Sequence, residues 1–183
     1  EELPANLVTR ILDTVSTEDR MKINELLNYP DDSAGSIMTT EYVNLKKHTT
    51  VEGALAHIKK TGIHKETIYT CYVLENRKLI GIVTAKELMT MDSDMTMEEL
   101  MTTEFLSVTT HTDQEETAKL FSKYGFLAIP VVDRQGFMVG IVTVDDAMDV
   151  MLDETTEAME LMSALIPSET SYFETSVLTH AKN

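Results

Sequence analysis

Hydrophobic and polar residues follow the same order twice along the chain. Each copy contains two apolar runs of strand length separated by a short polar turn. The runs are Thr67–Leu74 and Lys78–Val83 in the first copy, and Leu127–Val132 and Phe137–Val142 in the second. A shared sequence, M-T-T-E followed by an aromatic residue, precedes them at residues 38–42 and 101–105 and marks the start of each copy. Such a duplication predicts two structural units that bury one shared core.

Patterns that start helices are duplicated in the same way. Residues 49–52 and 112–115 both have the form T-x-x-E, the capping box in which the two side chains cover free N–H groups of the first turn. The last strand of each copy runs directly into G-I-V-T-x-x-[DE], at residues 81–87 and 140–146, and a helix follows. Each unit therefore has the predicted order strand, helix, strand, strand, helix. The predicted fold class is α+β.

Helical patterns flank the duplicated region. Apolar residues between Leu3 and Leu27 recur with helical spacing up to Pro30, and one long helix is predicted from Val144 to Ile166, where Pro167 ends it. The linker after Pro30 leads through an acidic pair and a glycine to the first predicted strand. The predicted division is 1–30 for the helical segment, 31–91 and 92–147 for the two units, 148–167 for a connecting helix and 168–183 for a polar tail.

The net charge of the chain indicates which classes of partner it can bind. The chain carries 31 acidic and 15 basic residues, a formal net charge of −16. Nucleic acid is not expected as a partner, because binding to phosphates needs clustered Lys and Arg. No apolar run reaches the length of a membrane helix, and the first residue is Glu1, so we expect a fragment of a longer protein. A single cysteine, Cys71, excludes a disulfide within the chain and fits a reducing, cytoplasmic setting.

Acidic residues form a stripe on the last predicted helix. Asp146, Asp149, Asp153, Glu157 and Glu160 recur at intervals of three and four and share one face. No Lys or Arg lies between Asp145 and Ile166 to compensate for their repulsion. One interpretation is a solvated acidic surface. The other is a site for divalent cations, and oxygen ligands without His or Cys favour Mg²⁺ or Ca²⁺ over zinc.

The two strand-to-helix turns allow two interpretations as well. Thr84 and Glu87, and their counterparts Thr143 and Asp146, could simply cap their helices. Such a turn could also hold a ribose through its carboxylate and a phosphate at the helix N-terminus. The apolar residues Phe126, Leu127, Ile129 and Pro130 would then form a bed for an aromatic base.

These motifs together carry a resemblance to a known family. The duplicated G-I-V-T-x-x-[DE] unit resembles a tandem cystathionine-β-synthase-type (CBS) domain pair. More specifically, the chain from about residue 3 to residue 166 resembles the cytosolic part of MgtE-type magnesium transporters. The matching stretches are residues 29–35 (YPDDSAG), 66–69 (ETIY), 112–116 (TDQEE), 130–133 (PVVD) and 142–146 (VTVDD).

The resemblance implies a magnesium sensor. In that family a helical domain precedes the CBS pair, so residues 1–30 would be its remnant, and the acidic helix would be the plug helix that leads to a membrane pore absent from this chain. A homodimer on the cytoplasmic face of the membrane is implied, in which Mg²⁺ between domains and subunits closes the pore. The implied ligands are Asp146, Asp149, Glu154 and Glu157, with Glu115 on the second unit, and the acidic stripe adds Asp153.

The resemblance also implies ATP binding between the CBS units. The implied nucleotide-binding residues are Thr84, Lys86, Glu87, Phe126 and Pro130. Three positions depart from the pattern of relatives: Glu87 replaces the usual Asp, Lys86 replaces an Arg, and Thr70 stands where an aromatic residue can occur. Gly125 and Ala158 stand where relatives can carry an acid, so fewer Mg²⁺ ligands are expected in this chain.

Three other classes of function are weighed against the sensor. One is a structural scaffold, in which methionines of the last predicted helix line a partner surface, although such a stripe is more often core or dimer packing. An enzyme is not expected, because Cys71 lies inside an apolar strand and the five histidines have no metal-binding spacing. The stronger alternative is an adenine-nucleotide-sensing CBS module that regulates another protein, and it differs in needing nucleotide rather than Mg²⁺ alone. The sequence leaves open whether Asp31 and Asp32 bind an ion or only form the linker.

Overall fold

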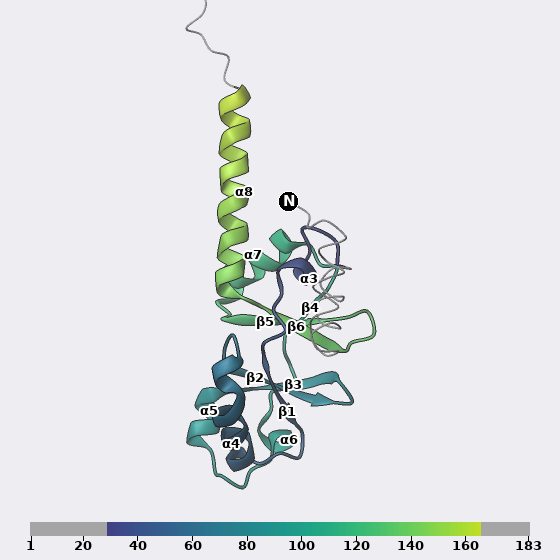
Figure 1. Cartoon of the computed structure of the whole chain (residues 1–183), viewed down its shortest axis with the longest axis vertical. Helices are drawn as coiled ribbons and strands as arrows, with labels where there is room; N and C mark the ends of the chain where they lie inside the picture. Colours follow the sequence, from purple (N-terminus) through teal and green to yellow (C-terminus); the bar gives the residue numbers. More distant parts are fainter. Residues whose placement is uncertain (1–28, 166–183) are drawn as a thin grey trace, which may run out of the picture.

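The computed structural model describes residues 29–165, so the helical pattern before Pro30 and the tail after the last helix lie outside the described residues. Two similar units are stacked along the long axis, and one long helix rises beyond the second unit (Figure 1). The first unit comprises β1 (Val43–Lys46), α4 (Val51–Thr61), the 3₁₀ turn η1 (Gly62–His64), β2 (Thr70–Glu75), β3 (Lys78–Thr84), α5 (Ala85–Thr90) and α6 (Met97–Leu100). The second comprises α3 (Ala34–Ile37), β4 (Val108–Thr109), α7 (Gln114–Tyr124), β5 (Ala128–Val132), β6 (Met138–Thr143) and α8 (Val144–Leu165).

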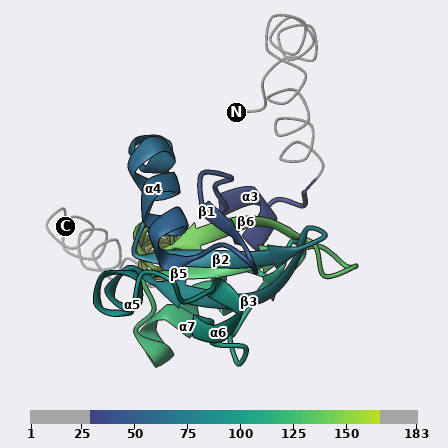
Figure 2. The same cartoon turned by 90° about the horizontal axis from the view of Figure 1, so that it is seen from below.

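Each unit is built on a three-stranded mixed sheet. The strand orders are β1-β2-β3 and β4-β5-β6, and in each sheet the first pair is parallel and the second antiparallel. Seen from below, the sheets lie between helices on both sides (Figure 2). The predicted α+β fold of two repeated units is confirmed.

Three apolar clusters hold these layers together. One lies inside each unit, with Val73 and Val83 in the first and Val131 and Val142 in the second. The third lies between the two sheets and consists of Tyr72, Ala128, Met138 and Ile141. Because alternate residues of a strand face opposite sides, β2 contributes Cys71 and Val73 to the core of its own unit and Tyr72 to the cluster between the units.

The segment that precedes each unit packs in the other one. Met38 belongs to the core of the second unit, and Thr39 pairs with Ile141 of β6. In reciprocal fashion Met97 belongs to the core of the first unit, and Thr102 pairs with Ile82 of β3. The repeated M-T-T-E sequence is therefore the point where the two units exchange segments. The linear division at residue 91 stays a prediction, but side chains on both sides of it share each core.

Two glycines permit this exchange. A Cβ at Gly140 would lie 2.7 Å from Met38 Sδ and 2.8 Å from the backbone oxygen of Thr39. A Cβ at Gly81 would lie 2.6 Å from Met101 Sδ. The glycine of G-I-V-T is thus required in both copies because the exchanged segment crosses directly over it.

Helix caps correct the predicted boundaries by one residue. Helix α4 is capped by Thr50, which accepts from the Gly53 N–H at 3.2 Å, and not by Thr49. Helix α7 is capped by Asp113, whose carboxylate accepts from the backbone N–H groups of Glu115 and Glu116, and not by Thr112. The first predicted strand is also preceded by the short helix α3, which a capping box between Ser33 and Ser36 begins.

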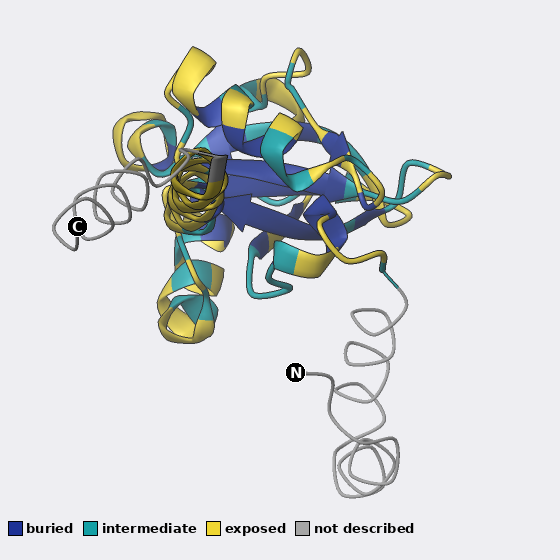
Figure 3. Ribbon diagram, turned by 90° about the horizontal axis from the view of Figure 1, so that it is seen from above, coloured by how far each residue is buried: buried dark blue, intermediate teal, exposed yellow. Residues whose placement is uncertain are grey.

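Helix α8 is the long helix predicted after the repeats. Its first turns are packed through Ala147 and Val150, whereas most residues after Val150 are exposed. From above, the helix stands out as an exposed element beside the buried strands (Figure 3). Between residues 29 and 165, no helix combines the length and apolar character that a membrane crossing requires.

The close approach at Gly140 gives a prediction for stability. Gly140→Ala should lower the free energy of unfolding by about 1–3 kcal/mol, because the new methyl group meets a backbone oxygen that cannot move aside as a side chain can. Urea denaturation followed by circular dichroism measures the change. Gly53→Ala, which adds the same methyl on the exposed face of α4, is the control and should not be destabilising. Equal stability of Gly140→Ala and the parent chain would contradict this account of the exchange.

Candidate functional site

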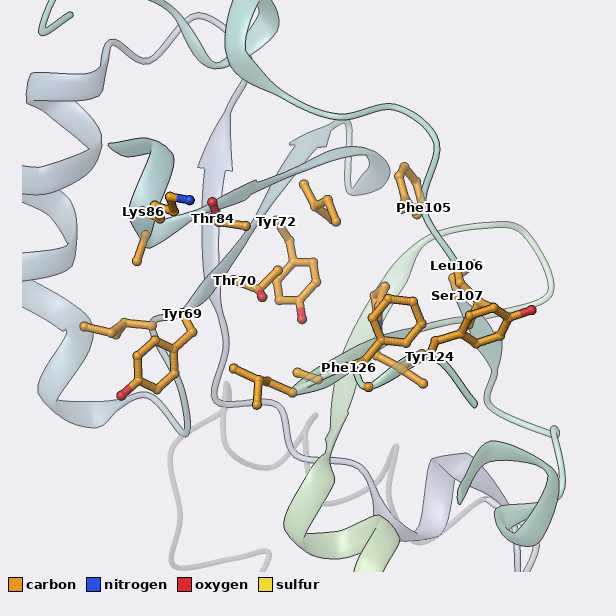
Figure 4. Close-up of a pocket in the computed structure, with 18 of the residues that line it drawn as sticks. Tyr69, Thr70, Tyr72, Thr84, Lys86, Phe105, Leu106, Ser107, Tyr124 and Phe126 are labelled. Carbon is orange, nitrogen blue, oxygen red and sulfur yellow. The ribbon is translucent and has the colours of Figure 1, made fainter. Parts of the chain in front are cut away.

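A cleft of about 1260 Å³ lies between the two units. One wall comes from β2, the end of β3 and the start of α5, and the other from the segment before β4 and from the end of α7 through β5 (Figure 4). The fold creates it because the strand-to-helix turn of the first unit faces the segment that leads into β4 of the second unit. Its lining residues are Ile68, Tyr69, Thr70, Tyr72, Ile82, Thr84, Ala85, Lys86, Met89, Glu104, Phe105, Leu106, Ser107, Tyr124, Gly125, Phe126, Leu127, Ala128, Ile129 and Pro130.

The predicted turn at Thr84 forms the polar end of the cleft. Thr84 and Lys86 line it. Glu87 does not, because its carboxylate caps α5: it accepts from the Thr84 backbone N–H and from the Thr84 hydroxyl, each at 2.7 Å. In the structure this motif therefore caps helix α5. Thr84 remains at the cleft surface, where its hydroxyl can also accept a hydrogen bond from a ligand.

Aromatic side chains form the opposite end. Phe126 and Pro130 line the cleft, as predicted for an apolar bed, and Tyr124 stands beside Phe126 with ring centroids 5.5 Å apart. Gly125 between them has φ +68°, the left-handed conformation that ends α7 and turns the chain toward β5. Any residue other than glycine at this position would be strained in this conformation.

Several lining residues were not predicted as site residues. Tyr72 and Thr70 face the cleft because they alternate on β2, and Phe105, Leu106 and Ser107 come from the segment between the units. The period of two along β2 could have placed Tyr72 on the side opposite Cys71. Phe105 is the aromatic residue that follows the second M-T-T-E, but nothing in the local sequence indicates that residues 105–107 line a cleft, since their position depends on the exchange of segments.

The predicted magnesium ligands are spread along α8 and the start of α7. Asp149, Asp153 and Glu157 are exposed on α8, whereas Glu154 is half-buried against α7. Asp146 accepts from the Thr143 hydroxyl at 2.6 Å, so its carboxylate caps the helix on which it lies. Only part of the predicted set is therefore brought together within the described chain.

Glu115 and Glu154 meet where α7 packs on α8. Desolvation by the packing is the largest cause that raises the pKa of Glu154, and the charge of Glu115 and a side-chain hydrogen bond with it raise the pKa further. Glu157 and Asp113 add to the same effect. Lys119 Nζ lies 3.0 Å from Glu115 Oε2 and is the cation that faces this pair, and the pKa of Lys119 is raised by that contact. One lysine beside four carboxylates leaves net negative charge at this point.

The described residues do not enclose a metal ion by themselves. No group of three or more His, Cys, Asp or Glu side chains with metal-binding geometry occurs within residues 29–165. Mg²⁺ keeps several waters and usually takes one or two carboxylates from a protein, so a pair such as Glu115 and Glu154 fits its chemistry.

The acidic linker is fixed to the same end of α7. The Asp32 backbone oxygen accepts from the Gln114 N–H at 2.8 Å, and Asp32 Oδ1 accepts from Gln114 Nε2 at 3.3 Å. Asp32 has φ +59°, and Asp31 beside it is exposed. The linker thus has a structural role at Asp32, and an ion-binding role for either carboxylate stays untested.

Comparison with known proteins follows the same division into two units. The model of the CBS domain family matches residues 34–94 and 97–153. The chain is 37% identical over 166 residues to the magnesium transporter MgtE of Thermus thermophilus, covering 90% of this chain and 37% of that protein. It is 38% identical to MgtE of Bacillus subtilis, covering 84% of this chain and 34% of that protein. The chain spans about a third of the length of these curated relatives.

A solved structure shows the same architecture. A crystal structure of the cytosolic domain of the Mg²⁺ channel MgtE in complex with ATP is similar with a TM-score of 0.76 and 39% sequence identity. The match covers 81% of this chain and 60% of that one. The resemblance drawn from the sequence is confirmed: the chain belongs to the CBS domain family, as a tandem pair of the type found in the cytosolic part of MgtE magnesium transporters.

Proposed function

We propose that this chain is the Mg²⁺-sensing regulatory region of a magnesium transporter or channel, on the cytoplasmic face of the membrane. The observation that carries the proposal is the carboxylate pair Glu115–Glu154, held together by the packing of α7 on α8 with too few cations around it. A divalent cation would remove this repulsion. The names of the relatives, all magnesium transporters at 37–39% identity, support the same function.

Mg²⁺ would act by favouring one of two conformations. The acidic face of α8 repels any other acidic surface, such as a second copy of the helix, when no cation is present. Mg²⁺ that binds carboxylates from both surfaces stabilises the closed arrangement by its difference in affinity for the two states. In our proposal the chain forms a homodimer, and bridging ions draw domains and subunits together so that a membrane pore outside this chain closes.

Adenine nucleotide binding in the cleft is the second part of the proposal. The cleft offers a cation and a hydroxyl at one end, Lys86 and Thr84, and an aromatic bed at the other, Phe126. A nucleotide has its charged phosphates and its flat base at opposite ends in the same way. The similar MgtE domain was crystallised with ATP, which supports ATP as the ligand.

An adenine-nucleotide sensor attached to another protein is the alternative. It is favoured by one observation: the cleft is complete within the described chain, whereas the set of metal ligands is not. The two functions differ in their response to Mg²⁺ without nucleotide, because only the magnesium sensor requires compaction by the ion alone.

Mg²⁺ titration is the first test. The radius of gyration should fall and Tm should rise with Mg²⁺, relative to K⁺ at matched ionic strength and without nucleotide. Mg²⁺ at ten times its Kd should add about 1.4 kcal/mol per site, or roughly 3–6 °C in Tm. Glu115→Gln/Glu154→Gln should remove most of this response, whereas Asp92→Asn/Asp94→Asn, which neutralises two exposed carboxylates after α5, should retain it. No response beyond the K⁺ control would favour the nucleotide sensor.

The raised pKa of Glu154 predicts a pH-dependent stability. A carboxyl group whose pKa is higher in the folded chain than its ordinary value of 4.5 stabilises the fold below that value and loses the contribution as pH rises through the folded-state pKa. Glu154→Gln should therefore raise Tm by about 1–2 °C at pH 7 without Mg²⁺, and the difference should close near pH 4. Thermal melts of both chains across this range measure it. A variant that is less stable than the parent at pH 7 would contradict the repulsion inferred here.

Lys86 gives a test of the nucleotide end. Lys86→Ala should weaken ATP binding about three- to tenfold while leaving adenosine binding unchanged, because only ATP carries phosphates for the ammonium group to contact. Isothermal titration calorimetry with both ligands measures the split. Lys59→Ala, on the outer surface of α4, is the charge-matched control. Equal loss for ATP and adenosine would place Lys86 away from the phosphates.

A further inference from the structure

The hydroxyl of Tyr72 is a buried polar group that the fold does not satisfy. It is the one buried side-chain nitrogen or oxygen without a hydrogen-bond partner found in the described part of the chain. Tyr72 itself is 0% exposed, and it packs among Ala128, Met138 and Ile141 in the cluster between the sheets. Buried polar atoms are nearly always paired, so an unpaired phenol indicates that something outside the polypeptide pairs with it.

No group in the described part of the chain lies within hydrogen-bonding geometry of the Tyr72 hydroxyl. The ring of Tyr42 meets it edge-on, with centroids 5.8 Å apart at 88°, and the remaining neighbours in its cluster are apolar. Burial raises the pKa of the Tyr72 phenol, with smaller contributions from Cys71 and Tyr42, so the hydroxyl keeps its proton at neutral pH. It is therefore available as a hydrogen-bond donor.

Tyr72 lies between the two ends of the cleft. It is both fully buried and part of the lining, so it forms part of the floor. Its ring projects from β2 toward the space that separates Thr70 from Phe126 (Figure 4). Lys86 and Thr84 lie toward one end of this space, and Phe105, Tyr124 and Phe126 lie toward the other (Figure 4). A ligand with phosphates at Lys86 and a base at Phe126 would place its nucleoside portion over the Tyr72 hydroxyl.

We infer that the Tyr72 hydroxyl donates a hydrogen bond to an acceptor atom on the nucleoside portion of a ligand in the cleft, and so determines specificity for that portion. The inference rests on the nucleotide binding proposed above. It gives Tyr72 and Lys86 separate tasks, with the nucleoside held by the phenol and the phosphates by the ammonium group. A site built to hydrogen-bond one group of a ligand discriminates strongly against analogues that lack it.

Tyr72→Phe tests the inference because it removes only the hydroxyl. Its Kd for adenosine and its Kd for ATP should both rise about tenfold, in contrast to Lys86→Ala, which affects ATP alone. The free Tyr72→Phe chain should melt at the same temperature as the parent or higher, since it loses an unsatisfied buried group. Tyr42→Phe removes a phenol from the neighbouring ring, which is not part of the cleft lining, and should leave both affinities unchanged.

The outcomes separate this inference from the function on which it rests. If the parent chain binds neither adenosine nor ATP, nucleotide binding fails and the role of Tyr72 fails with it. If the parent binds and Tyr72→Phe binds equally well, nucleotide binding stands and the inference is overturned, leaving the hydroxyl to a structural water. Loss of ATP binding alone would also overturn it, because the contact would then be with the phosphates.

Discussion

The exchange of segments between the units is the constraint on which the rest of the structure depends. Met38 crosses Gly140 in the second unit, and Met101 crosses Gly81 in the first, so neither core is complete without residues from the other half of the repeat. The exchange brings the two sheets face to face. It also places the strand-to-helix turn after β3 opposite the segment that leads into β4. The cleft is a consequence of this arrangement, since its two walls come from different units.

The sequence predicted the repeat well because both copies carry the same strand and turn patterns. It did not predict the exchange, because hydrophobic periodicity identifies the buried side of a segment but not the core that receives it. The caps were misplaced by one residue because Thr49, Thr50, Thr112 and Asp113 are all good capping residues, and the packing of α4 and α7 on their sheets decides between them. Tyr72 was missed for a similar reason, since a tyrosine within an apolar strand is typical of a core.

The two candidate sites, the cleft and the acidic surface at α7 and α8, differ in how complete they are within the described chain. The cleft combines apolar surface, a cation and hydroxyl groups within one chain. The acidic surface brings carboxylates together at the contact of α7 and α8, where the one facing lysine cannot neutralise them. Folding leaves this charge uncompensated because the apolar packing of Ala147 and Val150 fixes the position of α8 regardless of its acidic face. The net negative charge at this contact is thus a property of the backbone arrangement.

The unsupported length of α8 has a mechanical consequence. After Glu154 the helix continues to Leu165 and is exposed as far as Ala164, so at 1.5 Å per residue this part is a rod of roughly 16 Å. A rod of this length amplifies rotation: a tilt of about 10° at the contact with α7 moves the far end by roughly 3 Å. The helical hydrogen bonds keep it stiff enough to transmit that displacement. Any change of tilt at the contact between α7 and α8 would therefore be enlarged at the far end of the helix.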